Sequence, residues 1–348
     1  MTFKLENIVR ESIMRLKPYS SARDDYKSDG SKMTFFDANE NPFDNNGLNR
    51  YPDPWQRDLK VQLSQIKNIA PSNMLLGNGS DEVLDLIVRA FCEPGTDEII
   101  INPPTYGMYK VIADINNVAV KEVLLTSDFQ IDLAGLNNAV SDNTKIIFLC
   151  SPNNPTGNLL HSDSLIPLLQ SFNGLVVIDE AYISFAESPS WIEQLVNFPN
   201  LIVTQTLSKA MGMAGIRLGM CFASQEIINI LNKIKPPYNV NALTQDFALQ
   251  GLSDTNRIAT NVAKIIEERR SLESDLQSIS FIENIYPSDS NFLLMKVDNA
   301  SNRYNELIRN GIVVRNRSTQ PRCEECLRIS VGTPEENKKL INVLKSLI

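Results

Sequence analysis

Short apolar runs alternate with amphipathic stretches between about residue 75 and residue 250, and this alternation limits the possible folds more than any other feature. Apolar runs rich in β-branched residues, separated by segments of helix length, predict a mostly parallel sheet with helices on both faces. Helices are expected over 80–92 and 162–171, each followed by turn-forming residues. The expected strands are Glu98–Ile101, Val120–Leu125, Lys145–Cys150, Leu175–Asp179, Leu201–Thr206 and Gly219–Ala223.

The pattern changes after residue 250 and predicts a second, smaller α/β domain. A long helix is expected over 258–278. Strands over 291–297, 312–315 and 327–331 then alternate with helices over 302–310 and 334–347. We therefore expect a large domain over 46–251, and an N-terminal arm plus small C-terminal domain over 1–45 and 252–348. Apolar residues at helical spacing from Leu5 to Leu16 predict an amphipathic helix that packs on the body or on a partner.

Charge and composition favour small-molecule chemistry in the cytoplasm. The 348 residues are 43% apolar and 21% charged, with a net charge of −8 and no basic cluster, which argues against nucleic-acid binding. No apolar run is long enough for a membrane span, and no signal sequence is expected. Glu6 and Glu11 disfavour a transit peptide.

The five cysteines do not form the pattern of a secreted disulfide framework, so a reducing compartment is expected. Cys323 and Cys326 form an isolated CxxC pair, and His161 is the one histidine of the chain. One such pair cannot complete a tetrahedral zinc site. We expect no metal centre.

Two loops have the composition of ligand-binding segments. In Gly77–Glu82, Ser80 and Asp81 begin an expected helix, whose free N–H groups either receive ordinary capping or bind a phosphate. Ser151–Gly157 follows a strand and combines two prolines, two asparagines and a glycine. Such a loop is either a structural turn or a ligand-binding edge, where Asn154 could donate to a cofactor oxygen.

Asp179 ends one expected strand, and Lys209 follows another. A lysine in a loop is ordinarily solvated, and an acid at a strand end is ordinarily either exposed or part of a structural ion pair. However, pyridoxal phosphate chemistry needs an imine-forming lysine and a carboxylate that keeps the pyridine nitrogen protonated. As a general base, Lys209 would contribute about 10²–10⁴ in rate. Ser208 and Arg217 could donate hydrogen bonds to the cofactor phosphate.

Four segments extend this pattern: Pro103–Tyr109, Cys150–Gly157, Val177–Tyr182, and Leu207–Ala210 with Ala214–Arg217. Together they resemble the histidinol-phosphate aminotransferase family, within the pyridoxal-phosphate aminotransferases of the aspartate aminotransferase fold (fold type I). The resemblance extends over almost the whole chain, from Pro18–Arg23 and Ala38–Pro42 to Cys326–Thr333.

The resemblance implies roles for individual residues. Lys209, Asp179 and Tyr182 would be catalytic: Lys209 carries the cofactor imine, Asp179 pairs with the ring nitrogen, and Tyr182 bonds the ring oxygen together with Asn154. Tyr106 would stack on the ring. The phosphate would be held by Ser80, Asp81, Thr206, Ser208 and Arg217, and by the partner subunit's Tyr51. Many relatives have serine at the position of Thr206. Threonine keeps the hydroxyl group, so Thr206 can still donate a hydrogen bond.

The same resemblance implies a homodimer and a reaction. The enzyme would exchange an amino group between L-histidinol phosphate and 2-oxoglutarate in histidine biosynthesis, with Arg315, Arg328 and Tyr19 binding the substrate. Two guanidinium groups suit donors that carry phosphate or carboxylate groups, although either arginine could instead form a surface ion pair. The alternatives are an aromatic amino acid aminotransferase, a threonine-phosphate decarboxylase of the same fold, and a non-catalytic cofactor sensor.

Overall fold

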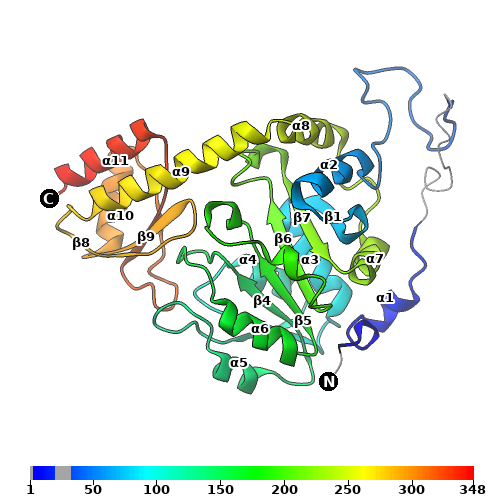
Figure 1. Ribbon diagram of the computed structural model, residues 1–348, viewed down its shortest axis with the longest axis horizontal. Helices are drawn as coiled ribbons and strands as arrows, with labels where there is room; N and C mark the ends of the chain where they lie inside the picture. The colour runs from blue at the N-terminus through cyan, green and yellow to red at the C-terminus, as the bar shows by residue number, and fades with distance from the viewer. Residues whose placement is uncertain (1–2, 20–32) are drawn as a thin grey trace.

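The computed structural model describes residues 3–19 and 33–348, and its centre is a seven-stranded sheet (Figure 1). The strand order is β1-β7-β6-β5-β4-β2-β3. Five neighbouring strands, from β6 to β3, pair in parallel, whereas β7 is antiparallel to both β6 and β1. The strands are β1 Met74–Asn78, β2 Glu98–Ile101, β3 Ala119–Glu122, β4 Thr144–Cys150, β5 Leu175–Asp179, β6 Leu201–Thr206 and β7 Leu218–Ala223.

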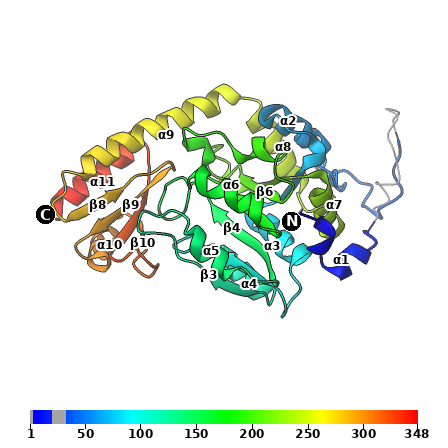
Figure 2. The ribbon, with the colours of Figure 1, turned by 60° about the horizontal axis from the view of Figure 1, so that its bottom comes forward.

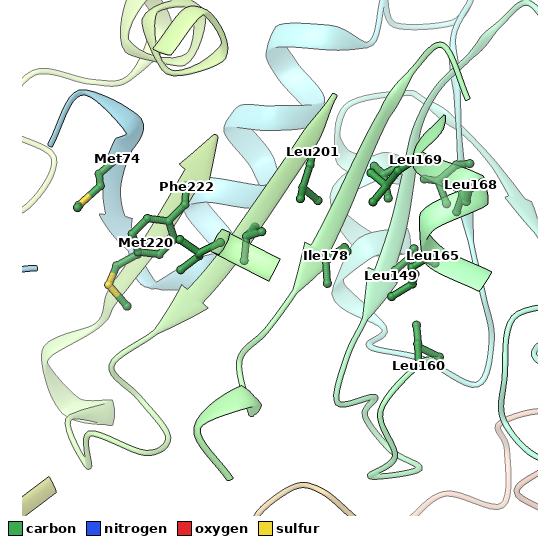
Figure 3. Close-up of a cluster of buried hydrophobic side chains, with 14 of the residues drawn as sticks. Met74, Leu149, Leu160, Leu165, Leu168, Leu169, Ile178, Leu201, Met220 and Phe222 are labelled. Atoms are coloured by element: carbon green, nitrogen blue, oxygen red, sulfur yellow. The ribbon is translucent and has the colours of Figure 1, made fainter. Parts of the chain in front are cut away.

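Helices cover both faces of this sheet because alternate residues of its strands point to opposite sides. In β4, Ile146 and Phe148 belong to one buried cluster, and Ile147 and Leu149 belong to the other. Figure 3 shows leucines of α6 (Ser162–Ser171) packed over Leu149 and Ile178 on the second face. The first face is covered by α3 Gly79–Phe91, α4 Met108–Ile115 and α7 Gln225–Ile234, and the second by α2 Arg57–Lys67, α5 Leu133–Ala139, α6 and α8 Ala242–Leu252.

A separate four-stranded antiparallel sheet lies at the other end of the molecule, in the order β10-β11-β9-β8. The 22-residue helix α9 (Thr255–Leu276) runs from α8 to this sheet, as Figures 1 and 2 show. Leu272 and Leu276 of α9 pack in its core. The remaining elements of this part are β8 Ile282–Tyr286, β9 Phe292–Val297, α10 Ala300–Arg309, β10 Arg315–Asn316, β11 Cys326–Ser330 and α11 Pro334–Ser346.

Most expected elements occur within a few residues of their predicted bounds, but the N-terminal helix does not. A 3-10 turn η1 (Leu5–Asn7) and a short helix α1 (Glu11–Arg15) replace it. Arg10 separates them in an extended conformation, because its N–H donates to the carbonyl of Ala90 and its side chain bonds Glu93. These tertiary contacts override the helical pattern. The other 3-10 helices are η2 Pro71–Asn73, η3 Ile183–Phe185, η4 Trp191–Gln194 and η5 Ala214–Ile216.

The seven-stranded sheet lies within 46–251 and the four-stranded sheet within 252–348. We propose that these two ranges form a large and a small domain. Of the N-terminal arm, α1 packs on α7, so this part contacts the large domain. Residues 20–23 of the Pro18–Arg23 segment lie outside the described residues. No helix in the described part of the chain is long and apolar enough to cross a membrane.

Candidate active site

A cavity lies at the ends of β1, β4, β5 and β6 and at the start of β7. Parallel strands bring their carboxyl ends to one edge of the sheet, where the following loops form ligand sites. The residues that line the cavity are Ser80, Asp81, Tyr106, Cys150, Asn154, Asp179, Ala181, Tyr182, Thr206, Ser208, Lys209 and Arg217.

The structure brings together ten of the eleven residues that the sequence suggested for the cofactor. The exception is Tyr51, which does not line the cavity. Cys150 and Ala181 also line it but were not predicted, and their only sequence signal is their place in the Cys150–Gly157 and Val177–Tyr182 segments. Of the substrate candidates, Arg328 reaches the cavity wall by a hydrogen bond from its Nη1 to Oδ1 of Asn154.

Two glycines let the N-terminus of α3 approach β7 closely. A Cβ atom on Gly219 would lie 2.2 Å from the Gly79 carbonyl carbon and 2.2 Å from the Ser80 nitrogen. Gly79 has φ +75°, and its N–H donates to the carbonyl of Arg217 over 2.8 Å. These contacts hold the start of α3 at the cavity, where free N–H groups and the positive end of the helix dipole favour an anion.

Hydroxyl and guanidinium donors surround the same end of the cavity. The hydroxyl oxygens of Thr206 and Ser208 are 2.9 Å apart, and the Ser208 N–H donates to Thr206 Oγ1 over 3.1 Å. Arg217 Nη1 lies 3.5 Å from Ser208 Oγ, and its Nη2 lies 4.0 Å from Asp81 Oδ2. The Tyr106 hydroxyl donates to Asp81 Oδ1. This set of donors suits a phosphate group.

Asp179 is a buried carboxylate that lines the same cavity as these donors. It is 3% exposed and accepts hydrogen bonds from the Tyr109 hydroxyl (2.9 Å) and the Ala181 N–H (3.2 Å). No ion pair among the described residues includes Asp179. Burial raises its pKa to about 6, and the Tyr109 hydrogen bond opposes that rise. A cationic ligand would therefore compensate a charge that the chain leaves unpaired.

Tyr109 is a residue that sequence analysis missed. Its ring is fully buried and stacks on Phe148 with centroids 5.0 Å apart, while its hydroxyl holds Asp179. The only available signal was its place in the Pro103–Tyr109 segment.

Glu180, the residue after Asp179, has a structural role. It accepts hydrogen bonds from Ser190, Trp191 and Gln205 on the other side of β5.

Lys209 lies in the loop after β6 and lines the same cavity as the phosphate-type donors and Asp179. Its Nζ is 5.6 Å from the centre of the Tyr182 ring. Burial lowers the pKa of Lys209, and the positive charge of Arg328 lowers it further, whereas Asp179 opposes the shift. A lowered pKa increases the fraction of neutral amine, which is the nucleophilic and basic form.

Tyr182 connects the cavity with the four-stranded sheet. Asn154 Nδ2 donates to the Tyr182 hydroxyl over 3.3 Å, and the Tyr182 ring packs edge-on against Phe292 of β9. Burial raises the Tyr182 pKa, and the charge of Arg328 opposes this. The Arg328 guanidinium lies 5.1 Å from the centre of the Phe292 ring. The four-stranded sheet therefore contacts the cavity through Phe292 and Arg328.

Tyr51 and Tyr19 lie away from the cavity of their own chain. Tyr51 stacks on Tyr238 with centroids 4.6 Å apart and borders a separate hollow near Leu243. Tyr19 follows α1, is 75% exposed and does not line the cavity. In Figure 1 helix α1 lies at the end of the molecule opposite to the four-stranded sheet. Arg315 also does not line the cavity; it is exposed on β10.

Comparison with known proteins agrees with this geometry. The family described as Aminotransferase class I and II matches residues 24–344. The chain is 59% identical to the histidinol-phosphate aminotransferase of Christiangramia forsetii, over 99% of this chain and 98% of the relative. The chain belongs to the histidinol-phosphate aminotransferases of this family. The aminotransferase family expected from the sequence is thus confirmed.

Solved structures support the same fold and cofactor. A histidinol-phosphate aminotransferase from Clostridium acetobutylicum is 26% identical, with a TM-score of 0.80 over 86% of this chain and 91% of that one. The histidinol-phosphate aminotransferase from Sinorhizobium meliloti, solved in complex with pyridoxal-5'-phosphate, is 26% identical. Its TM-score is 0.78, over 86% of this chain and 84% of that one. This aminotransferase therefore has the fold type I architecture and uses pyridoxal phosphate, as expected.

The residues of the cavity fit that cofactor. Donors for a phosphate lie near the start of α3, and Lys209 lines the same cavity. The carboxylate of Asp179, which has no ion pair among the described residues, suits a protonated ring nitrogen. The Tyr106 ring forms part of the wall. Three chemically different requirements of one molecule are thus met in one cavity.

Proposed function

We propose that this aminotransferase transfers the amino group between L-histidinol phosphate and 2-oxoglutarate, in the biosynthesis of L-histidine. Relatives of this chain are named histidinol-phosphate aminotransferases, which supports the phosphate-bearing substrate. The observation that carries the proposal is the buried Asp179, which has no ion-pair partner among the described residues, in one cavity with Lys209. Pyridoxal phosphate chemistry requires both groups.

Lys209 is the proposed acid–base residue. When bound, pyridoxal phosphate draws electrons from the Cα–H bond of an attached amine and so makes that proton acidic. The neutral Nζ of Lys209 accepts this proton and holds it, and the lowered pKa of Lys209 keeps a larger fraction of the amine neutral. Lys209 returns the same proton at the other end of the transfer.

Asp179 and its partners fix the position and charge of the ring. The Tyr109 hydroxyl and the Ala181 N–H hold the Asp179 carboxylate in one orientation. A cationic ring nitrogen beside it would restore an ordinary, low Asp179 pKa, because opposite charges favour the ionised form. Asn154 and Tyr182 are the proposed partners of the ring oxygen, and Tyr106 is the proposed stacking residue.

The proposed phosphate site of the cofactor consists of Ser80, Asp81, Thr206, Ser208 and Arg217. The start of α3 supplies N–H groups, while the hydroxyls and Arg217 supply the other donors. The carboxylate of Asp81 would repel a phosphate unless nearby positive charge or hydrogen-bond donors offset the repulsion. Its contacts with the Tyr106 hydroxyl and Arg217 indicate that it orients these two groups.

We also propose a homodimer in the cytoplasm, in which the partner's Tyr51 completes each cofactor site. The segment before α2 and the start of α8 expose large apolar side chains, a pattern typical of an interface. They are Phe36, Phe43, Leu48, Tyr51, Leu243 and Phe247. All five cysteines are free and buried, which agrees with a reducing compartment.

One assay separates the candidate reactions. The purified, cofactor-loaded protein is mixed with histidinol phosphate and 2-oxoglutarate, and glutamate formation is followed beside phenylalanine and tyrosine as donors. The proposal predicts the highest kcat/KM for histidinol phosphate. A preference for the aromatic donors would overturn the substrate assignment. Release of carbon dioxide from threonine phosphate without a keto acid would select the decarboxylase instead.

A further inference from the structure

Three arginines lie on one face of the small sheet. Arg315 of β10 is directly opposite Arg328 of β11, and the Arg317 N–H donates to the carbonyl of Cys326 over 2.8 Å. Side chains two residues apart on a strand share a face, as do directly opposite residues on neighbouring strands. Arg315, Arg317 and Arg328 therefore lie on the same face. Leu327 points the other way, into the core of the small domain.

Arg317 is a half-buried cation without a partner in the described part of the chain. Its side chain appears in none of the hydrogen bonds and ion pairs found there, and its Nε is shielded from solvent with no acceptor. Arg303 of the same domain shows the ordinary arrangement, with Asp298 and Glu306 as partners. Burial lowers the pKa of Arg317 to about 10, and repulsion by Arg328 and Arg315 adds to this.

The unpaired charges border the cofactor cavity. Arg328 bonds Asn154, which lines the cavity, and its own Nε is also buried without an acceptor. Arg317 interacts electrostatically with Tyr182, another lining residue, and with Arg328. Holding like charges together in a partly buried site costs free energy unless an anion compensates them. The arrangement is therefore suited to an anion of more than one charge.

We propose that Arg317 is a third anion-binding residue of the substrate site and sets the preference for a phosphate monoester over a carboxylate. This inference rests on the proposed function, which supplies the phosphate-bearing donor. A phosphate monoester carries a charge of about −1.5 to −2 at pH 7 and three acceptor oxygens, whereas a carboxylate carries one charge and two. A third guanidinium group therefore strengthens the binding of a phosphate monoester more than the binding of a carboxylate.

The test compares Arg317→Gln with Arg309→Gln, which removes the same charge from an exposed position at the end of α10. In Arg317→Gln, the KM for histidinol phosphate should rise roughly 10- to 100-fold, the effect of losing charged hydrogen bonds. The KM for 2-oxoglutarate and kcat should change less than about 3-fold. Arg317→Lys should recover part of the loss. An equal rise in both KM values, or no change, would overturn the proposal.

A second measurement does not depend on histidinol phosphate. Inorganic phosphate should inhibit the reaction of glutamate with the cofactor-loaded enzyme, whose cofactor phosphate site is already filled. Inhibition should weaken in Arg317→Gln and stay unchanged in Arg309→Gln. If the wild type rejects histidinol phosphate but phosphate inhibition still depends on Arg317, the proposed function fails and this inference stands. Equal inhibition of the wild type and both variants by phosphate would refute the role of Arg317 but not the proposed function. If Arg317→Gln does not fold, Arg317→Lys, which keeps the charge but loses the planar fork of donors, should show the same changes in weaker form.

Discussion

At the scale of the residue, Lys209 is the group on which the proposed chemistry depends. Its side chain is exposed within the cavity, where desolvation and the positive charge of Arg328 lower its pKa. Lys209→Ala should reduce kcat by at least about 10²–10⁴-fold, because the base at Cα is lost. Stopped-flow absorbance during the reaction with glutamate measures this step. The exposed Lys338 of α11 offers a matched control, and Lys338→Ala should retain wild-type rates.

Asp179 gives a prediction about pH. Burial raises its pKa from 3.8 to about 6, so the folded protein binds this proton more tightly than the unfolded chain does. Its contribution to stability is complete below about pH 4 and is lost as the pH rises through about 6. In the cofactor-free protein at pH 7, the ionised group costs about 3 kcal/mol. Asp179→Asn should remove this cost while it abolishes transamination.

Urea unfolding of the cofactor-free wild type and Asp179→Asn at several pH values measures the effect. The stability advantage of the variant should grow between pH 4 and pH 7. An advantage that does not change with pH would show that the Asp179 carboxylate is already compensated in the folded protein.

Single residues differ in how well the sequence predicts them. Lys209 and Asp179 were predicted because each follows an apolar strand in a recognisable segment. Tyr109 was missed because an aromatic residue on a helix ordinarily indicates core packing, and only the folded structure shows its hydroxyl 2.9 Å from Asp179. The unpaired state of Arg317 also depends on which side chains surround it, which no local pattern contains.

At the scale of the element, the close approach of α3 to β7 positions the proposed phosphate site. Gly219→Ala would place a Cβ 2.2 Å from the backbone of Gly79 and Ser80, so α3 must move. We expect a loss of roughly 1–3 kcal/mol in stability and weaker cofactor binding. Gly215→Ala is the control, since nothing lies within 4 Å of a Cβ there. Fluorescence titration with pyridoxal phosphate measures both variants, and equal affinities would contradict this account of α3.

The elements themselves were predictable where a strand is buried on both faces. The runs that became β2, β5 and β6 have the expected bounds, because continuous apolar residues are needed between two helical layers. β1 and β8 were not predicted. β1 includes Gly77 and Asn78, which indicate a turn, and β8 is an edge strand with two exposed residues. Antiparallel pairing of β7 also lies outside local sequence information, because it depends on the path of the chain.

At the scale of the whole molecule, the proposed dimer predicts complementation between two defective chains. Lys209→Ala and Tyr51→Phe chains should each have low activity. When they are mixed, unfolded and refolded together, half of the dimers are mixed, and each mixed dimer has one intact site. Activity should return to roughly one quarter of the wild-type value. Size-exclusion chromatography checks that dimers form, and no recovery in mixed dimers would place Tyr51 outside the partner's site.

The central claim is that the cavity between the strand ends and α3 holds pyridoxal phosphate, with Lys209 as its covalent partner. Borohydride reduction of the cofactor-loaded protein fixes any bond between a lysine and the cofactor aldehyde, and peptide mass spectrometry then locates it. We expect the added mass on the peptide that contains Lys209, and none in Lys209→Ala. Stoichiometric addition at a different lysine, such as the buried Lys60 or Lys235, would contradict the account.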